Sequence, residues 1–218
     1  MLMGEAVVAI WNGIAEAGRA EFYAWHLHEH MPERVGIPGF RRGRRYIALD
    51  GVTRPEFFTL YEADTFQVLQ GRDYTDRLNA PTPWTKTATA HFQDTSRALA
   101  RVVGSDGPGM GGVLLTVRLD VSDTDAAAEL VRRCAKAPRV CGAHLCVGDM
   151  AASDARTAES RDRTDIQAPP TSFALVEATD AEALCELLPD AELARVGCAR
   201  IERGVYRLEY VRVKTGFA

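Results

Sequence analysis

An order of segments that occurs twice along the chain is the feature that most constrains its fold. In the first half, β-rich segments predict strands at 5–12, 39–49, 56–63 and 91–103, with helices at 16–31 and from about residue 64. In the second half, strands are expected at 113–121, 140–147, 172–178 and 205–213, with helices at 125–135 and 180–188. Each half therefore has the order βαββαβ, which indicates an internal duplication.

Short stretches of sequence also align between the halves. Residues 38–40 (PGF) match 138–140 (PRV), and residues 60–63 (LYEA) match 175–178 (LVEA). The second pair lies further apart than the first because the second half carries extra residues at 151–170. This insert is polar and ends in two prolines, so we expect a long surface loop.

A βαββαβ unit forms a four-stranded antiparallel sheet with two helices on one face, the ferredoxin-like arrangement. Two such units can bury their bare sheet faces against each other. We therefore expect an α+β fold in which two ferredoxin-like repeats pack into an α+β barrel, an internal pseudo-dimer. The glycine-rich stretch 104–112 predicts the boundary, with repeats at 1–106 and 107–218 and the candidate site in the first. The pattern leaves open whether the barrel closes within one chain or between chains.

The composition excludes several classes of function. The apolar fraction of 46% and the charged fraction of 26% are typical of a folded chain. A net charge of −4 provides no basic field for nucleic acid or anionic lipid. No apolar run approaches the roughly 18 residues of a membrane-spanning helix. The five cysteines form no CxxC pair and no signal-like segment precedes them, so reduced thiols in a cytoplasmic protein are expected.

Residues 16–31 hold the most distinctive chemistry of the chain. Helical spacing groups five residues as the expected core face: Ala20, Tyr23, Ala24, Leu27 and Met31. Phe22 and Trp25 then project away from that face, which predicts contact with a second copy of the chain, as in a homodimer, or with the insert.

His26 and His30, four residues apart on this helix, admit three hypotheses. They could chelate a metal, but a third ligand is needed and Glu33 is the only nearby candidate, so we assign no metal ligand. One of them, His30 above all, could serve as a general acid or base at the edge of a pocket. Both could instead be capped or surface histidines near a helix end.

Four arginines follow in the next predicted strand. Alternation places Arg42 and Arg44 on the face of Phe40 and Tyr46, with Arg41 and Arg45 opposite. Both faces of a strand are largely covered in a barrel, so these guanidinium groups need partners. The partners could be acidic side chains across the sheets or an anionic group of a ligand.

The segment 74–84 combines two prolines with flanking aromatic residues and predicts a rigid loop. It could cover a cleft, or it could be a packed connector that holds Trp84 in the core.

With these residues in view, the first half resembles the EthD-like branch of the dimeric α+β barrel superfamily. The resemblance rests on the aromatic helix with Trp25, on His30 followed by Pro32, and on Pro38-Gly39-Phe40 at the start of a strand. The resemblance covers roughly residues 5–100. The superfamily includes cofactor-free monooxygenases, isomerases, cyclases and haem proteins. The resemblance indicates the fold strongly but says little about which reaction is catalysed.

The resemblance implies that His30 is the polar residue in a cleft between helix and sheet. The second half lacks the His-x-Pro element, so a single site is expected, and its one histidine, His144, lies on a predicted strand rather than where the haem branch binds iron. We therefore expect no cofactor. Under this hypothesis a small, largely apolar or aromatic molecule is bound or transformed, with His30 and Arg44 as catalytic residues. The expected substrate-binding residues are Tyr23, His26, Tyr46, Tyr61 and Trp84. The alternative is a non-catalytic ligand-binding protein or a structural homo-oligomer of the same fold.

Overall fold

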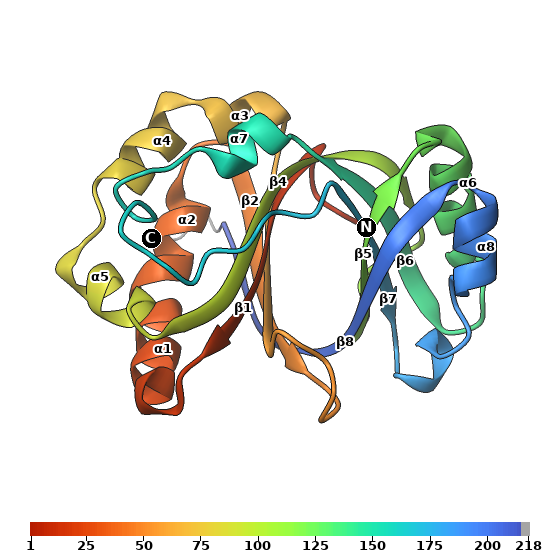
Figure 1. The fold of residues 1–218 in the computed structure, drawn as a ribbon, viewed down its shortest axis with the longest axis horizontal. Coiled ribbons are helices and arrows are strands. Elements are labelled where there is room, and N and C mark those ends of the chain that lie inside the picture. The colour runs from red at the N-terminus through yellow and green to blue at the C-terminus, as the bar shows by residue number, and fades with distance from the viewer. Residues whose placement is uncertain (215–218) are drawn as a thin grey trace.

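Eight antiparallel strands close into one barrel in the computed structural model, which describes residues 1–214 (Figure 1). The order around the barrel is β1-β3-β2-β8-β5-β7-β6-β4, so the strands of each half are neighbours and the barrel closes within a single chain. The strands are β1 (Ala6–Ile14), β2 (Phe40–Ala48), β3 (Phe57–Ala63), β4 (Phe92–Asp106), β5 (Val113–Val121), β6 (Val140–Gly148), β7 (Ser172–Ala178) and β8 (Cys198–Val213). The predicted fold class, two ferredoxin-like repeats forming an α+β barrel, is confirmed.

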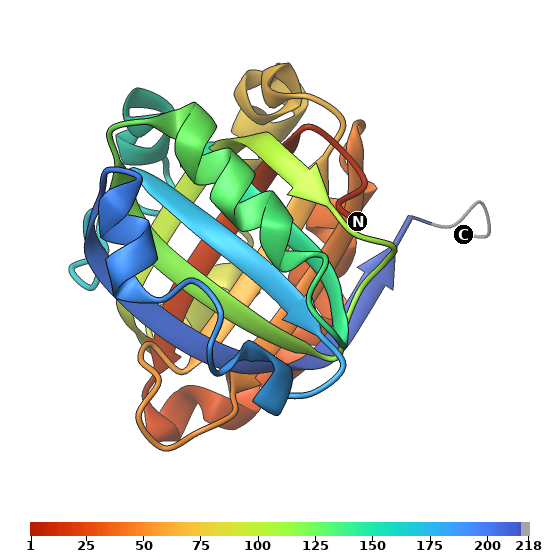
Figure 2. The same cartoon turned by 90° about the vertical axis from the view of Figure 1, so that its right-hand side faces the viewer.

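Helices cover the barrel on two opposite sides (Figure 1). The first repeat contributes η1 (Glu16–Gly18), α1 (Arg19–Trp25), η2 (His26–His30), α2 (Met31–Gly36), α3 (Phe66–Gln70), α4 (Arg72–Asn79) and α5 (Pro83–Thr89). The second contributes α6 (Thr124–Cys134), α7 (Met150–Asp154), η3 (Glu182–Leu184) and α8 (Asp190–Arg195). Figure 2 shows α6 and α8 lying across the second sheet, whereas α7 lies beside the helices of the first repeat in Figure 1.

The strand register repeats between the halves. In the first, Phe40 pairs with Ala63 and Arg42 with Glu62, with a bulge between the two pairs. In the second, Val140 pairs with Ala178 and Gly142 with Glu177, again across a bulge. The aligned stretches of sequence therefore occupy equivalent positions, and Glu62 and Glu177 are counterparts inside the barrel.

The bulge in β2 changes one detail of the expected pattern. It separates Phe40, which packs with Met31 and Tyr61 on the helix side, from Arg44 and Tyr46, which face the barrel interior. An extra residue in a strand reverses the alternation of faces beyond it. The predicted shared face of Arg42, Arg44 and Tyr46 is therefore correct, but Phe40 lies on the other face. The interior is filled by buried aromatic side chains: Trp11, Tyr46, Phe58, Phe173 and Tyr206.

The expected core face of the helix at 16–31 was wrong apart from Met31, which is fully buried. Leu27 is exposed, whereas Phe22 and Trp25 are each only 1% exposed and pack with Phe57 on the outer face of the sheet. The helix has two apolar sides, and the side with two aromatic rings buries far more apolar area than the alanine side.

This burial also removes the observation on which the predicted homodimer rested. Phe22 and Trp25 contact the protein's own sheet and offer no exposed face to a second copy. The homodimer stays a prediction, which sedimentation of the purified protein would test. Within residues 1–214, none of the helices has the length and apolar character required to cross a membrane.

Candidate functional site

A π-helical turn positions both histidines of the first repeat. It runs from His26 to His30 and joins α1 to α2 without a break. Its hydrogen bonds span five residues instead of four, so Trp25 and His30, which are five apart, both face the sheet. Such wide turns are rare and occur frequently at functional sites.

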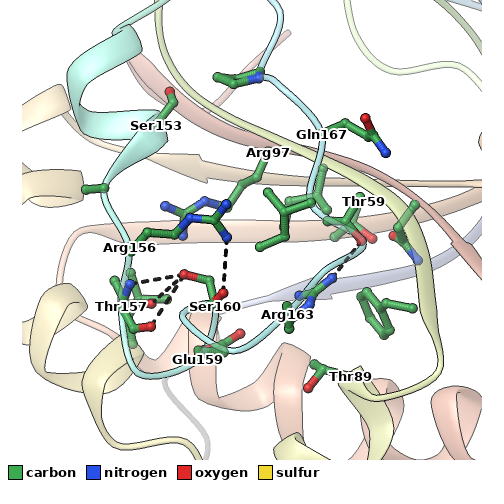
Figure 3. Close-up of a pocket in the computed structure, with 18 of the residues that line it drawn as sticks. Thr59, Thr89, Arg97, Ser153, Arg156, Thr157, Glu159, Ser160, Arg163 and Gln167 are labelled. Carbon is green, nitrogen blue, oxygen red and sulfur yellow. Dashed lines mark hydrogen bonds between the residues drawn. The ribbon is translucent and has the colours of Figure 1, made fainter.

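A cavity of about 200 Å³ lies between this helical turn, the outer face of the first sheet and the insert of the second repeat (Figure 3). Its apolar walls are Ile10, Phe22, Trp25, Leu78 and Phe92. Asn12, Thr59 and Thr95 on the strands provide polar atoms, and His26 and His30 line it from the helix. An engineered apolar cavity of about 150 Å³ holds benzene, so this space accommodates a small aromatic molecule.

The insert forms the outer wall of the cavity and is bonded firmly to the first repeat. The backbone N–H of Thr95 donates to the Asp165 carbonyl at 2.9 Å, and that of Gln167 donates to the Thr95 carbonyl at 2.7 Å. The N–H of Glu159 donates to the Leu78 carbonyl at 3.1 Å, and its carboxylate pairs with Arg34. The expected surface loop is therefore a cover over the site, supplied to the first repeat by the second.

His30 and His26 are buried, 6% and 3% exposed, and both are neutral imidazoles. Burial, followed by the positive charges of Arg45 near His26 and of Arg34 near both, holds each pKa well below the usual value of 6.5. The His30 ring packs on Trp25 with centroids 4.2 Å apart, and its buried Nδ1 has no hydrogen-bond partner within residues 1–214. A neutral imidazole with an unpaired nitrogen at the wall of a cavity can accept a proton.

Three other expected site residues lie around the cavity rather than in its lining. Tyr61 lies beneath His30 with ring centroids 6.1 Å apart, and burial raises the pKa of its hydroxyl. Tyr23 is half-buried and its hydroxyl donates to Glu209 at 3.4 Å. Trp84 packs on the cluster around Phe22. The segment 74–84 forms parts of α4 and α5 instead of a rigid loop, so Trp84 belongs to a packed connector.

The structure places Arg44 and Tyr46 inside the barrel, on the opposite face of the sheet from His30. Arg44 is fully buried, and its guanidinium contacts Glu62 at 3.0 Å and Glu177 at 2.8 Å. Arg42 donates two hydrogen bonds to the same Glu62. Of the two partners that we considered, the acidic side chains across the sheets are those observed. These carboxylates neutralise Arg44, so we do not retain it as a catalytic residue.

The described residues form no cluster of metal ligands, and His144 is not placed to bind a haem. Between residues 1 and 214, no three His, Cys, Asp or Glu side chains are grouped as metal ligands. Glu33, the only candidate for a third ligand beside His26 and His30, pairs with Arg77. His144 is fully buried inside the barrel, where its Nδ1 lies 2.8 Å from the Ser105 hydroxyl and its Nε2 faces Glu177. That ring therefore has no open side toward a haem.

Residues of β4 and of the insert were missing from the expected site. They include Arg97 from the strand, and Ser153, Arg156, Glu159, Ser160 and Arg163 from the cover (Figure 3). The one sequence signal for this contact was the aromatic pair Phe22 and Trp25, for which the insert was one of two expected partners, and both residues line the cavity together with the insert. Nothing in the insert itself indicated which of its residues take part.

Comparisons with known proteins support the fold. No family model matches the chain, and no curated protein matches its sequence. Among solved structures, an anthrone oxidase-like protein superimposes with a TM-score of 0.59 at 8% identity, covering 95% of this chain and 92% of that one. A candidate monooxygenase from Fusobacterium nucleatum gives 0.56 at 10% identity, covering 99% and 98%. A chlorite dismutase mutant from Candidatus Nitrospira defluvii gives 0.52 at 10%, covering 95% and 92%. At these identities the likeness concerns the fold, and the chain is a tandem ferredoxin-like α+β barrel similar to these proteins.

Proposed function

We propose that this protein binds a small planar aromatic molecule in the covered cavity of the first repeat, and that His30 removes a proton from it. The observation that carries the proposal is the neutral, buried and unbonded imidazole of His30 at the wall of an aromatic-lined cavity. The apolar walls favour a flat, largely apolar ligand, because burial of such a surface stabilises the complex in proportion to its area.

The chemistry proposed for the bound molecule is deprotonation of a ring carbon whose carbanion is conjugated with a ring carbonyl. The cover limits contact with bulk water, which slows quenching of the carbanion by solvent. Such a carbanion can transfer electrons to dioxygen directly, a cofactor-free oxygenation, or be reprotonated elsewhere, an isomerisation. For anthrone, after which one structural neighbour is described, one dioxygen is consumed per molecule. One oxygen atom enters the new quinone carbonyl and the other leaves as water.

Proton removal can be measured without knowing the natural substrate. Anthrone is mixed with the protein in D2O without oxygen, and exchange of its acidic C–H is followed by NMR. We expect acceleration over buffer, and we expect His30→Gln to reduce it by roughly 10²–10⁴-fold. His28→Gln is the matched control, because His28 lies on the same turn but is exposed to solvent. With oxygen admitted, uptake should match quinone formation.

The alternative proposal is a protein of the same fold that binds a ligand without converting it, or that has a structural role as a homo-oligomer. Binding of an aromatic probe without proton exchange from any of several carbon acids would favour the non-catalytic binding protein. Failure of every aromatic probe to bind would favour the structural role.

A further inference from the structure

The geometry points to Arg97 as the binding site for a carboxylate group, so that the ligand of the cavity is an aromatic carboxylate. This inference rests on the proposed function, because it defines the chemical class of the molecule that the cavity takes. Arg97 lies in β4 opposite Ile10 of β1, on the sheet face that carries the cavity. It is half-buried, and its guanidinium group forms no ion pair or hydrogen bond with any described group among residues 1–214.

The other buried or half-buried guanidinium groups around the cavity are already neutralised. Arg163 contacts Asp165 at 2.6 Å and donates to the Thr95 hydroxyl at 2.7 Å. Arg34 pairs with Glu159, the one acidic residue of the lining that is not exposed. Arg97 is therefore the cation of the lining that has both partial burial and an unused set of donors (Figure 3).

The chemistry around Arg97 favours a carboxylate. A guanidinium group presents two parallel N–H donors that match the two oxygens of a carboxylate. Two polar side chains of the same sheet face, Asn12 and Thr59, line the cavity and can add hydrogen bonds. Arg156, which donates to the Ser160 carbonyl at 3.2 Å, adds positive charge from the cover. Asp154 at the rim opposes it, but Asp154 is exposed and its charge is screened by solvent.

The carboxylate of the ligand would also orient the molecule for the proton transfer to His30. The carboxylate held by Arg97 on the sheet would fix the aromatic ring between the aromatic walls, so that its acidic carbon faces His30 on the helix. Orientation of this kind reduces the motion that must be lost in the reaction.

Two probes of the same shape test the inference: 2-naphthoate, which is an anion, and 2-naphthamide, which is neutral. Their affinities for the intact protein are measured by calorimetry. We expect the wild type to bind 2-naphthoate about tenfold more tightly than 2-naphthamide, as expected for a charged hydrogen bond. Arg97→Met should abolish this preference, because it weakens the binding of 2-naphthoate far more than that of 2-naphthamide. Arg97→Lys should retain part of it, since the charge remains but the paired donors are lost.

Arg101→Met is the matched control. Arg101 lies on the same strand four residues further on, its guanidinium stacks over Phe66 at 3.8 Å, and it does not line the cavity. Its replacement removes the same charge and should leave the preference intact. Equal affinity of the wild type for both probes, or a preference that survives Arg97→Met, would overturn the role of Arg97 while the cavity remains a binding site. Binding of neither probe would overturn both the inference and the proposed function.

Discussion

The buried ion network inside the barrel makes the sharpest prediction about stability. Its core is two guanidinium groups, Arg42 and Arg44, and two carboxylates, Glu62 and Glu177. Glu62, Arg44 and Glu177 are all 0% exposed. Glu177→Gln keeps an acceptor oxygen for Arg44 but leaves one positive charge in excess in the interior. Because breaking a buried pair costs about 3–5 kcal/mol, we expect the free energy of unfolding to fall by about 3 kcal/mol.

The pH dependence of this loss follows from the pKa of Glu177. Burial alone would raise this pKa, but the neighbouring His144 and Arg44 lower it from 4.5 to about 2. The unfolded chain then takes up a proton below pH 4.5 while the folded chain does not, so the contribution of Glu177 is complete above pH 4.5 and is lost as the pH falls toward 2. Urea unfolding at several pH values should therefore show the difference between wild type and Glu177→Gln shrinking below pH 4.5.

A double-mutant cycle completes the test. Arg44→Met in the Glu177→Gln background removes the excess charge, so the double variant should be less destabilised than the sum of the single variants. The exposed pair of Arg132 and Glu129 on α6 is the control, and Arg132→Ala should cost less than about 1 kcal/mol. Additive costs at Arg44 and Glu177, or a loss below about 1 kcal/mol for Glu177→Gln, would refute the reasoning.

Three further outcomes are expected. Because the pKa values of His26 and His30 are held below 6.5, the unfolded chain binds more protons at these residues than the folded chain does. The free energy of unfolding should therefore fall as the pH drops below 6.5, and it should fall less in His30→Phe. The same pH profile in the wild type and His30→Phe would contradict this. Gly43→Ala should lower the free energy of unfolding by about 1–3 kcal/mol, because the added Cβ would lie 2.1 Å from Met31 Sδ. Urea unfolding that shows no change would be inconsistent with that contact. A thiol reagent should label the exposed Cys185 in the native protein while the buried Cys146 reacts only after unfolding.

The sequence predicted the repeated fold well because the signal is local and occurs twice. Glu62 and Glu177 lie at matching places in two similar strands, and matching strands have the same register. The position of His30 in a cleft between helix and sheet followed from a resemblance, and the cavity it lines has that position.

The remaining parts of the site depend on contacts between segments that are distant in the sequence. Nothing near Arg156 or Glu159 indicates that the insert docks on Leu78 and Thr95 of the other repeat. The choice of helix face was similarly non-local, since Trp25 and Leu27 are both apolar and only the sheet beneath decides which is buried. Arg44 was assigned to the wrong environment because its neutralising partner Glu177 lies in the second repeat.

The repeats meet at two strand pairs, β2 with β8 and β4 with β6, and these two joints have a consequence for biosynthesis. As the chain leaves the ribosome, the sheet β4-β1-β3-β2 is complete before β5 to β8 exist, and it has unpaired edges at β2 and β4. Free edges of this kind pair readily with other chains. The joint at β2 forms only with β8, where Arg42 lies opposite Val213, so closure waits for the last strand in chain order. On a crowded polysome, a neighbouring chain's β8 competes for that edge, and its success would yield an exchanged dimer containing two complete barrels.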